Sequence, residues 1–335
     1  MSRVGFALGY GKFMDAREMA KSMKKAEDRG FEMGFFSETI ELMRDSVTAI
    51  AAIGLNTTKM SLGWTQIVRL RTPVIMAQSL ASLDELTQGR VYLAPGACTK
   101  GHAQVHSLER IKPILTLTEW VESMRLLLTG EKISYHGEVI HLDDVQLGFT
   151  PFRKEIPLLI PATSTVGLKL AGKIGDGVML NALCSDVYTK NAIKILKTAV
   201  AEAGRDWSKF AVYKLVNCSV EDDHKKAVDR MKPELATRFK PIQFPFATRP
   251  LMTIGEPCIK EEDIPVFEEA WEKKGIDGLV EVLPDSYVES MTASGTPDEV
   301  LKRVQDFEDA GVQVCCLRPA AQDQADRLLD LFAHK

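Results

Sequence analysis

Long hydrophobic runs, a signal peptide and an excess of basic charge are all missing from this chain. No apolar stretch reaches the roughly 18 residues that a bilayer-spanning helix needs, and residues 1–11 lack the layout of a signal peptide. The formal net charge is −4 with acidic and basic residues intermixed, so no basic surface for nucleic acid is expected. These absences predict a cytoplasmic protein that binds a small molecule and neither a membrane nor nucleic acid.

The chain also lacks CxxC pairs, internal repeats and low-complexity tracts. Its six cysteines include the neighbours Cys315 and Cys316, which lie in an apolar stretch. We therefore expect reduced thiols that are mostly buried.

Short apolar strands alternate with amphipathic helices along most of the sequence. In residues 71–96, Pro73 suits the first turn of a helix, Gly89 ends that helix, and a buried strand begins at Val91. The pattern predicts eight strands, over residues 4–8, 31–37, 59–68, 91–96, 156–161, 177–180, 210–219 and 312–317. Further helices are predicted over residues 15–29, 46–55, 113–129, 166–174, 186–203, 222–239 and 297–310. This order predicts an α/β fold of the (β/α)8 TIM-barrel type, in which the loops after the strands carry the chemistry.

Two segments break the alternation. We expect a single domain over residues 1–335, because α/β barrels often use this much chain. Residues 130–155 predict a strand-rich insertion or hairpin, and residues 240–294 predict an excursion between strands seven and eight that becomes helical at residues 265–274. The apolar and aromatic start of the excursion, residues 242–252, is compatible with a pocket wall, a lid or a subunit contact.

Four segments, taken in order, carry a resemblance to a known family. They are residues 71–90, 112–131, 156–182 and 294–311. With them the chain resembles the luciferase-like (β/α)8 oxidoreductases, and most of all their deazaflavin-dependent branch, which includes the methylenetetrahydromethanopterin reductases. The resemblance implies a homodimer formed through helices near strands two and three, and a coenzyme at the carboxyl ends of the strands: the deazaflavin F420, or alternatively FMN.

A loop of small residues, PATSTVGLK, follows strand five and leads directly into a helix. Such a loop exposes N–H groups at the positive end of a helix and suits a phosphate. The alternative is an ordinary helix cap made by Ser164 or Thr165. The resemblance implies that the coenzyme phosphate is held here and after strand four, by Ala162, Thr163, Ser164, Thr165, Gly96, Ala97 and Cys98.

Strand six carries two polar residues with different expected roles. Asp176 precedes the strand between two glycines, at the end of the barrel opposite the chemistry, so we expect it to be structural. Asn181 follows the strand and is expected to face the coenzyme.

The exit of strand three, LGWTQIV, resembles the place where family members run their backbone beneath the coenzyme ring. The resemblance implies a cis peptide bond at Gly63–Trp64 or Trp64–Thr65, with Trp64 and Thr65 against the coenzyme. The alternative for Trp64 is plain core packing.

The acid–base residues usual in the reductases are partly absent here. Glu38 ends strand two where the family has an acidic residue, but Thr39 replaces the histidine that commonly follows. Ala7 and Thr99 stand where the reductases have acids, so pterin substrates are not expected.

His102, His106 and Glu38 are therefore the candidate catalytic residues, because the two histidines follow strand four and titrate near neutrality. No third ligand accompanies the two histidines, so no metal is predicted. His136 and His141, in the insertion, are expected to be surface groups.

Three functions remain open at this point. The first is hydride transfer between F420 and a small organic substrate. The second is an FMN-dependent monooxygenase that receives reduced flavin from a partner reductase, because FMN activates oxygen and a deazaflavin does not readily do so. The third is a flavin-binding barrel without turnover.

Overall fold

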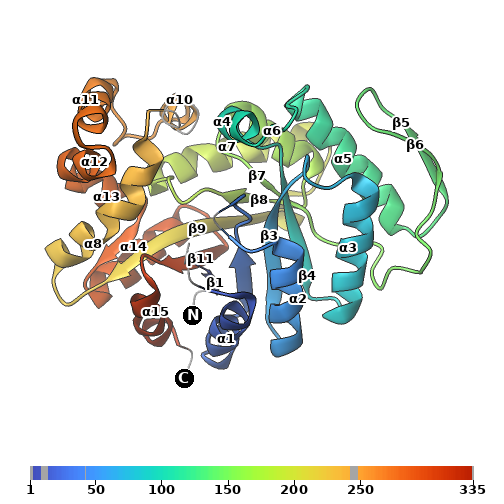
Figure 1. Ribbon diagram of the computed structural model, residues 1–335, viewed down its shortest axis with the longest axis horizontal. Coiled ribbons are helices and arrows are strands. Elements are labelled where there is room, and N and C mark those ends of the chain that lie inside the picture. Colours follow the sequence, from blue (N-terminus) through green and yellow to red (C-terminus); the bar gives the residue numbers. More distant parts are fainter. Residues whose placement is uncertain (1–2, 9–13, 42, 242–247, 334–335) are drawn as a thin grey trace.

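Eight parallel strands form a barrel that is nearly closed (Figure 1). The computed structural model describes residues 3–8, 14–41, 43–241 and 248–333, without the side chain of His102. The barrel strands are β1 (Val4–Ala7), β2 (Met33–Phe36), β3 (Ser61–Ile67), β4 (Val91–Gly96), β7 (Leu159–Pro161), β8 (Gly177–Leu180), β9 (Ala211–Val220) and β11 (Val314–Pro319). Their order around the barrel is β4-β3-β2-β1-β11-β9-β8-β7.

The barrel closes between β4 and the residues just before β7. A parallel bridge joins Leu93 to Leu158, and the Leu93 amide donates to the Pro157 carbonyl at 2.9 Å. The predicted (β/α)8 fold and all eight predicted strands are confirmed, although the fifth strand is shorter than expected.

Helices surround the barrel. Those that alternate with the strands are α1 (Ala16–Asp28), α2 (Ser46–Asn56), α3 (Pro73–Leu86), α5 (Pro113–Leu128), α6 (Thr165–Ile174), α7 (Asp186–Glu202), α8 (His224–Ala236) and α14 (Pro297–Asp309). Additional helices are α4 (Lys100–Val105), α10 (Arg249–Ile254), α11 (Ile264–Lys274), α12 (Ile276–Val282), α13 (Asp285–Met291) and α15 (Ala325–Leu331). None of the helices in the described part of the chain is long and apolar enough to cross a membrane.

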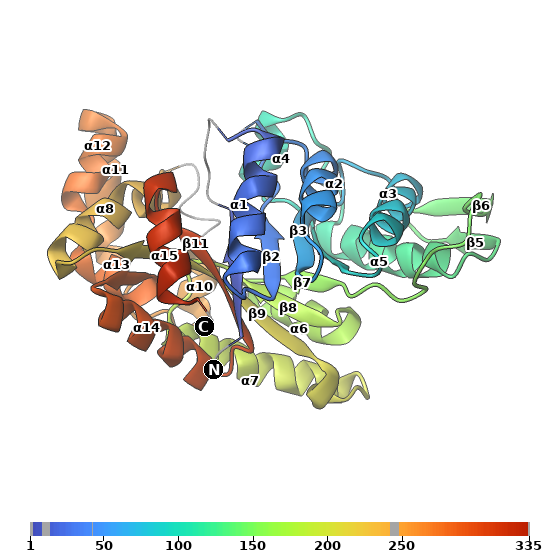
Figure 2. The same cartoon turned by 90° about the horizontal axis from the view of Figure 1, so that it is seen from below.

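The insertion and the excursion lie at opposite ends of the molecule in both views (Figures 1 and 2). The insertion forms the antiparallel hairpin β5 (Ile133–His136) and β6 (His141–Val145) beside α5, as predicted. The excursion carries α10 to α13, of which only α11 was predicted, and residues 242–247 lie outside the described residues. It ends in β10 (Ala293–Gly295), which pairs with the end of β9 and was missed because it is only three residues long.

Alternation along the strands separates two apolar layers. Side chains such as Phe35, Tyr92 and Met179 fill the barrel interior, and a larger cluster lies between strands and helices. Gly63 faces the interior, where an added Cβ would lie 2.0 Å from ring atoms of Tyr92. Its neighbour Trp64 therefore points the other way and is fully buried in the outer layer.

The turn before β8 has the structural role predicted for it. The Asp176 carboxylate accepts the Leu158 amide at 2.9 Å and pairs with Arg125 at 3.0 Å. It thereby ties the starts of two neighbouring strands to α5.

The predicted cis peptide bond is wrong. No peptide bond within the described residues is cis. Gly63 and Trp64 pair in regular register with β2 on one side and β4 on the other. Such a continuous ladder is made by extended trans backbone.

Candidate functional site

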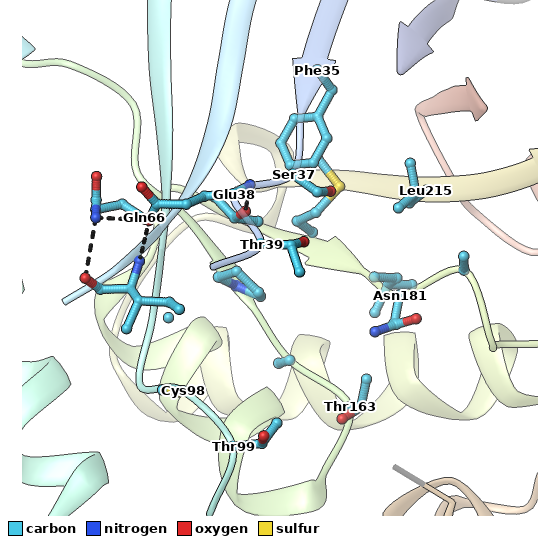
Figure 3. Close-up of a pocket in the computed structure, with 18 of the residues that line it drawn as sticks. Phe35, Ser37, Glu38, Thr39, Gln66, Cys98, Thr99, Thr163, Asn181 and Leu215 are labelled. Carbon is cyan, nitrogen blue, oxygen red and sulfur yellow. Dashed lines mark hydrogen bonds between the residues drawn. The ribbon is translucent and has the colours of Figure 1, made fainter. Parts of the chain in front are cut away.

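A cavity of about 330 Å³ opens at the carboxyl ends of the barrel strands (Figure 3). Its position is where TIM-barrel enzymes place their active sites, and its size falls within the range of small-molecule pockets. It is lined by Phe35, Ser37, Glu38, Thr39, Ile40, Thr65, Gln66, Ile67, Gly96, Cys98, Thr99, Pro161, Ala162, Thr163, Met179, Leu180, Asn181, Ala182, Leu215, Arg238 and Arg318.

The structure brings together about half of the residues predicted for the site. Those that line the cavity are Glu38, Thr65, Gly96, Cys98, Ala162, Thr163 and Asn181. Those that do not are Trp64, Ala97, Ser164, Thr165 and His106. His102 lies in α4, and its side chain is outside the described residues.

Glu38 occupies the cavity wall between β2 and β3. Its carboxylate accepts the Ser46 hydroxyl at 2.8 Å, the Gln66 side-chain amide at 2.9 Å and the Ile67 backbone amide at 3.2 Å. Its own N–H donates to the Thr65 hydroxyl at 2.7 Å. Desolvation raises the pKa of Glu38, although these donors act against the shift.

Gln66 is fully buried and presents an acceptor that the described residues leave unused. Its amide nitrogen donates to Glu38 and to the Ile67 carbonyl. Its Oε1 atom has no hydrogen-bond partner among the described residues. A buried acceptor without a partner is costly, but Gln66 shares the outward-facing alternation of Trp64 and its Oε1 is not accessible from the cavity.

The loop after β4 forms the next part of the wall. An added Cβ at Gly96 would have only Pro161 Cγ within 4 Å, at 3.9 Å, so this glycine leaves room above the strand end. Cys98 adopts a positive φ of 66°, and its carbonyl accepts Arg110 Nε at 3.1 Å. Burial raises the pKa of the Cys98 thiol, so it is a neutral wall group at neutral pH.

The loop after β7 combines a helix cap with a cavity wall. Ser164 is the N-cap of α6, and its hydroxyl accepts the Gly167 amide at 3.1 Å. The Thr163 carbonyl accepts the Tyr188 hydroxyl at 2.8 Å. Ala162 and Thr163 face the cavity, whereas Ser164 makes the cap that was the alternative interpretation of this loop.

Two arginines that were not predicted from the sequence, Arg238 and Arg318, also line the cavity. Arg318 is the penultimate residue of β11, where its Nε donates to Asn217 at 2.9 Å and its guanidinium pairs with Glu234 at 2.9 Å. Arg238 pairs with the same carboxylate at 3.6 Å. Arg318 is a charged residue in the otherwise apolar stretch VCCLRP, at the end of a barrel strand. This signal in the sequence could have identified it as a site residue.

His106 lies away from the cavity. Its Nε2 atom pairs with a carboxylate oxygen of Glu41 at 3.3 Å. His106 is therefore not part of the cavity wall, although it follows β4 as expected.

The whole chain resembles characterised proteins. The profile of the family described as luciferase-like monooxygenase matches residues 1–314. A 5,10-methylenetetrahydromethanopterin reductase from Archaeoglobus fulgidus is 27% identical over 325 residues, which cover 95% of each chain. An F420-dependent glucose-6-phosphate dehydrogenase from Nakamurella multipartita is 24% identical over 332 residues, or 95% of this chain and 91% of the relative.

Solved structures share the fold. The coenzyme F420-dependent tetrahydromethanopterin reductase from Methanopyrus kandleri superposes with a TM-score of 0.85 at 20% identity, over 99% of this chain and 98% of that one. An F420-dependent secondary alcohol dehydrogenase in complex with an F420–acetone adduct gives a TM-score of 0.80 at 21% identity, over 99% and 97%. Together with the profile match along nearly its entire length, these findings show that the chain belongs to the luciferase-like monooxygenase family of TIM-barrel oxidoreductases.

Proposed function

We propose that this protein is an oxidoreductase that uses F420 to transfer hydride to or from a small organic substrate. The observation that carries the proposal is the cavity at the barrel mouth, whose wall combines apolar side chains with a few polar groups such as Asn181 and Thr163. The choice of F420 over FMN is supported by relatives that match nearly the full chain and are named as F420-dependent or as methanopterin reductases.

The residues of the cavity fit a deazaflavin ring. Asn181 is exposed in the cavity wall, and its side-chain amide is suited to a hydrogen bond with the polar edge of the ring. Gly96 leaves open space at the rim, and Phe35, Met179 and Leu215 offer apolar surface to a flat aromatic ring. We assign the phosphate side to the loop after β7, where Ala162 and Thr163 face the cavity beside the N-terminus of α6.

When bound, F420 supplies a ring carbon that gives or accepts hydride. The protein contributes a rigid wall around that chemistry. Glu38 fixes the side chain of Gln66 and the backbone of Ile67, and the apolar barrel interior beneath the cavity excludes water.

Proton handling has few candidates within the cavity. Among the described lining residues, Glu38 is the only carboxyl group and no histidine is present. The carboxylate already accepts three hydrogen bonds, so we assign Glu38 as a positioning residue rather than the proton donor. His102 stays an untested candidate from the sequence.

The test is a fluorescence titration of the purified apoprotein with F420 and with FMN. We expect F420 to bind at least about tenfold more tightly than FMN, a difference of about 1.4 kcal/mol. Asn181→Leu is expected to weaken F420 binding about tenfold, because the ring loses this hydrogen-bond partner.

Trp64→Phe is the matched control. Trp64 lies in the barrel strand β3 but is buried in the outer layer, and its Nε1 has no partner among the described residues. We expect unchanged F420 affinity for this variant. Tight FMN binding without F420 affinity would favour the monooxygenase and overturn the proposal. Binding of neither compound would also contradict it, because the cavity would then hold no flavin-type coenzyme.

A further inference from the structure

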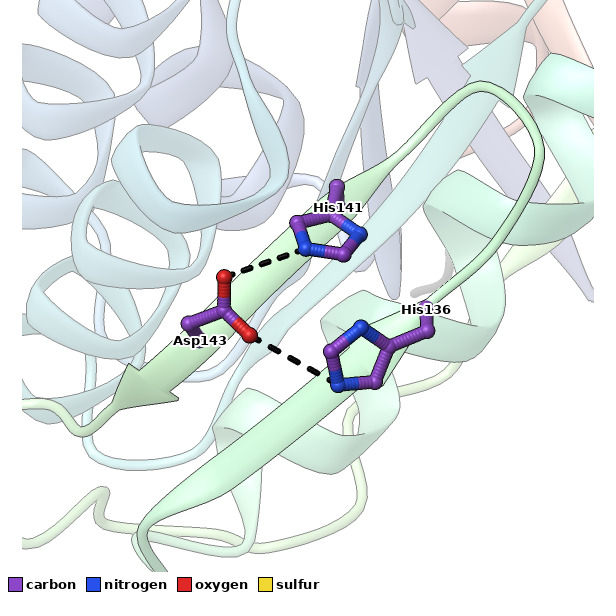
Figure 4. A group of neighbouring side chains, drawn as sticks. All are labelled: His136, His141 and Asp143. Atoms are coloured by element: carbon purple, nitrogen blue, oxygen red, sulfur yellow. Dashed lines mark ion pairs between the residues drawn. The ribbon is translucent and has the colours of Figure 1, made fainter.

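Two histidines and an aspartate meet on the exposed face of the β5–β6 hairpin (Figure 4). His136 lies directly opposite His141 in the antiparallel pair, and Asp143 follows two positions later on the same face of β6. One carboxylate oxygen of Asp143 lies 3.0 Å from His141 Nε2 and the other 3.6 Å from His136 Nε2. One ligand atom from each residue falls within 4.8 Å of the others.

These distances suit a small transition-metal ion. Ligand atoms about 2.0–2.1 Å from a tetrahedral Zn²⁺ lie roughly 3.3 Å from one another, and each histidine lies at a comparable distance from one of the two Asp143 oxygens. Two imidazoles and one carboxylate favour Zn²⁺, Cu²⁺ or Ni²⁺ over Mg²⁺ and Ca²⁺, which prefer oxygen ligands.

The hairpin is held in place before any ion arrives. The carboxylate of Glu119 in α5 is buried and accepts the backbone amides of Glu138, Val139 and Ile140, each at 2.8 Å. Gly137 allows this approach, since an added Cβ there would lie 2.5 Å from the Glu119 carboxyl carbon. The turn that sets the distance between the two histidines is therefore anchored to the barrel, which lowers the ordering cost of binding.

We propose that His136, His141 and Asp143 form a surface site for a divalent transition-metal ion of the Zn²⁺ class, with water completing the coordination. None of the three residues lines the cavity at the barrel mouth. The ion would connect β5 to β6 and stabilise the hairpin, so this site has a structural role and is independent of the proposed oxidoreductase activity.

The test is isothermal titration of EDTA-treated protein with ZnCl₂, together with the visible absorption of the Co²⁺-substituted protein. We expect one Zn²⁺ per chain, a higher thermal midpoint with the ion, and no competition from an equal concentration of Mg²⁺. His136→Ala and His141→Ala are each expected to weaken Zn²⁺ binding at least about tenfold, and Asp143→Asn less, since the two imidazoles remain.

The control is His224→Ala. His224 is also exposed and lies 3.1 Å from carboxylate oxygens of both Glu289 and Glu299, but this group does not form a three-ligand cluster among the described residues. We expect it to leave Zn²⁺ binding unchanged. Zn²⁺ affinity that is the same in the wild type and in all three hairpin variants, or absence of Zn²⁺ binding, would overturn the proposal whatever the outcome of the F420 titration.

Discussion

Glu38 shows how one partly buried carboxylate organises the mouth of the barrel. Its three donors come from the start of α2 and from the end of β3, so it connects two elements that approach the cavity from different sides. Burial favours the neutral carboxyl over the charged carboxylate, and this raises the pKa of Glu38. A side chain with this environment shapes the wall around a ligand even when it takes no part in proton transfer.

The pH dependence of stability tests this role in the variant Glu38→Gln. Because the folded pKa lies above the ordinary 4.5, the folded state binds its proton at a higher pH than the unfolded state does. Wild-type stability contributed by this group therefore rises as the pH falls through the folded pKa towards 4.5. Urea unfolding from pH 7 to pH 4.5 should show the wild type gaining on Glu38→Gln, and a constant difference between the two proteins would contradict the prediction.

At the scale of elements, the opposite end of the barrel is tied together by buried charges. The Glu27 carboxylate at the end of α1 accepts the backbone amides of Thr58, Lys59 and Met60 at 2.8, 2.7 and 2.9 Å. Arg90, before β4, donates to carbonyls of the same connection, Thr57 and Met60 among them. The carboxylate of Glu27 and the guanidinium of Arg90 thus both hydrogen-bond the connection from α2 to β3. This connection lies at the end of the barrel opposite the active-site loops, where residues contribute to stability.

Glu27→Gln is predicted to reduce stability at neutral pH without affecting ligand binding. Desolvation alone would raise the pKa of Glu27, but the three amide donors outweigh it and lower the pKa to about 2. The side chain is 5% exposed, and a depression of this size corresponds to as much as about 3 kcal/mol of unfolding free energy. The contribution is present above pH 4.5 and is lost as the pH falls towards 2.

Chemical denaturation at several pH values checks this prediction. The matched control is Glu32→Gln, which removes an exposed carboxylate paired with Arg3 and should change the unfolding free energy by no more than about 0.5 kcal/mol. Equal effects of the two substitutions at pH 7 would show that the amide donors around Glu27 contribute little.

Exposed apolar side chains occur on several outer helices, including those near strands two and three. Leu55 in α2, and Ile75 and Leu86 in α3, are 69%, 51% and 43% exposed, and Leu70 lies between β3 and α3. These are the helices near strands two and three through which the family resemblance implies a dimer. The homodimer, like the single domain, stays a prediction, and the exposed apolar side chains support it.

Ile75→Glu tests the dimer. We expect the wild type to sediment with a mass near twice 37.2 kDa and the variant to shift towards the single chain, because a charge in an apolar contact is left without a partner. Val266→Glu, at a similarly exposed apolar position on α11, should leave the sedimentation unchanged. A wild type that sediments as a single chain at all concentrations would exclude this assembly.

The sequence by itself determined the order of strands and helices, the barrel, and the strand ends that surround the cavity. These features depend on local periodicity and on the position of a residue after a strand, which located Thr163 and Asn181, whereas Glu38 and Gly96 came from the family resemblance. Only the tertiary structure decided which neighbour faces inward, because alternation and register follow from pairing on both sides of a strand. For that reason Trp64 turned to the outer layer, Arg318 joined the cavity wall, and His136 came to lie opposite His141.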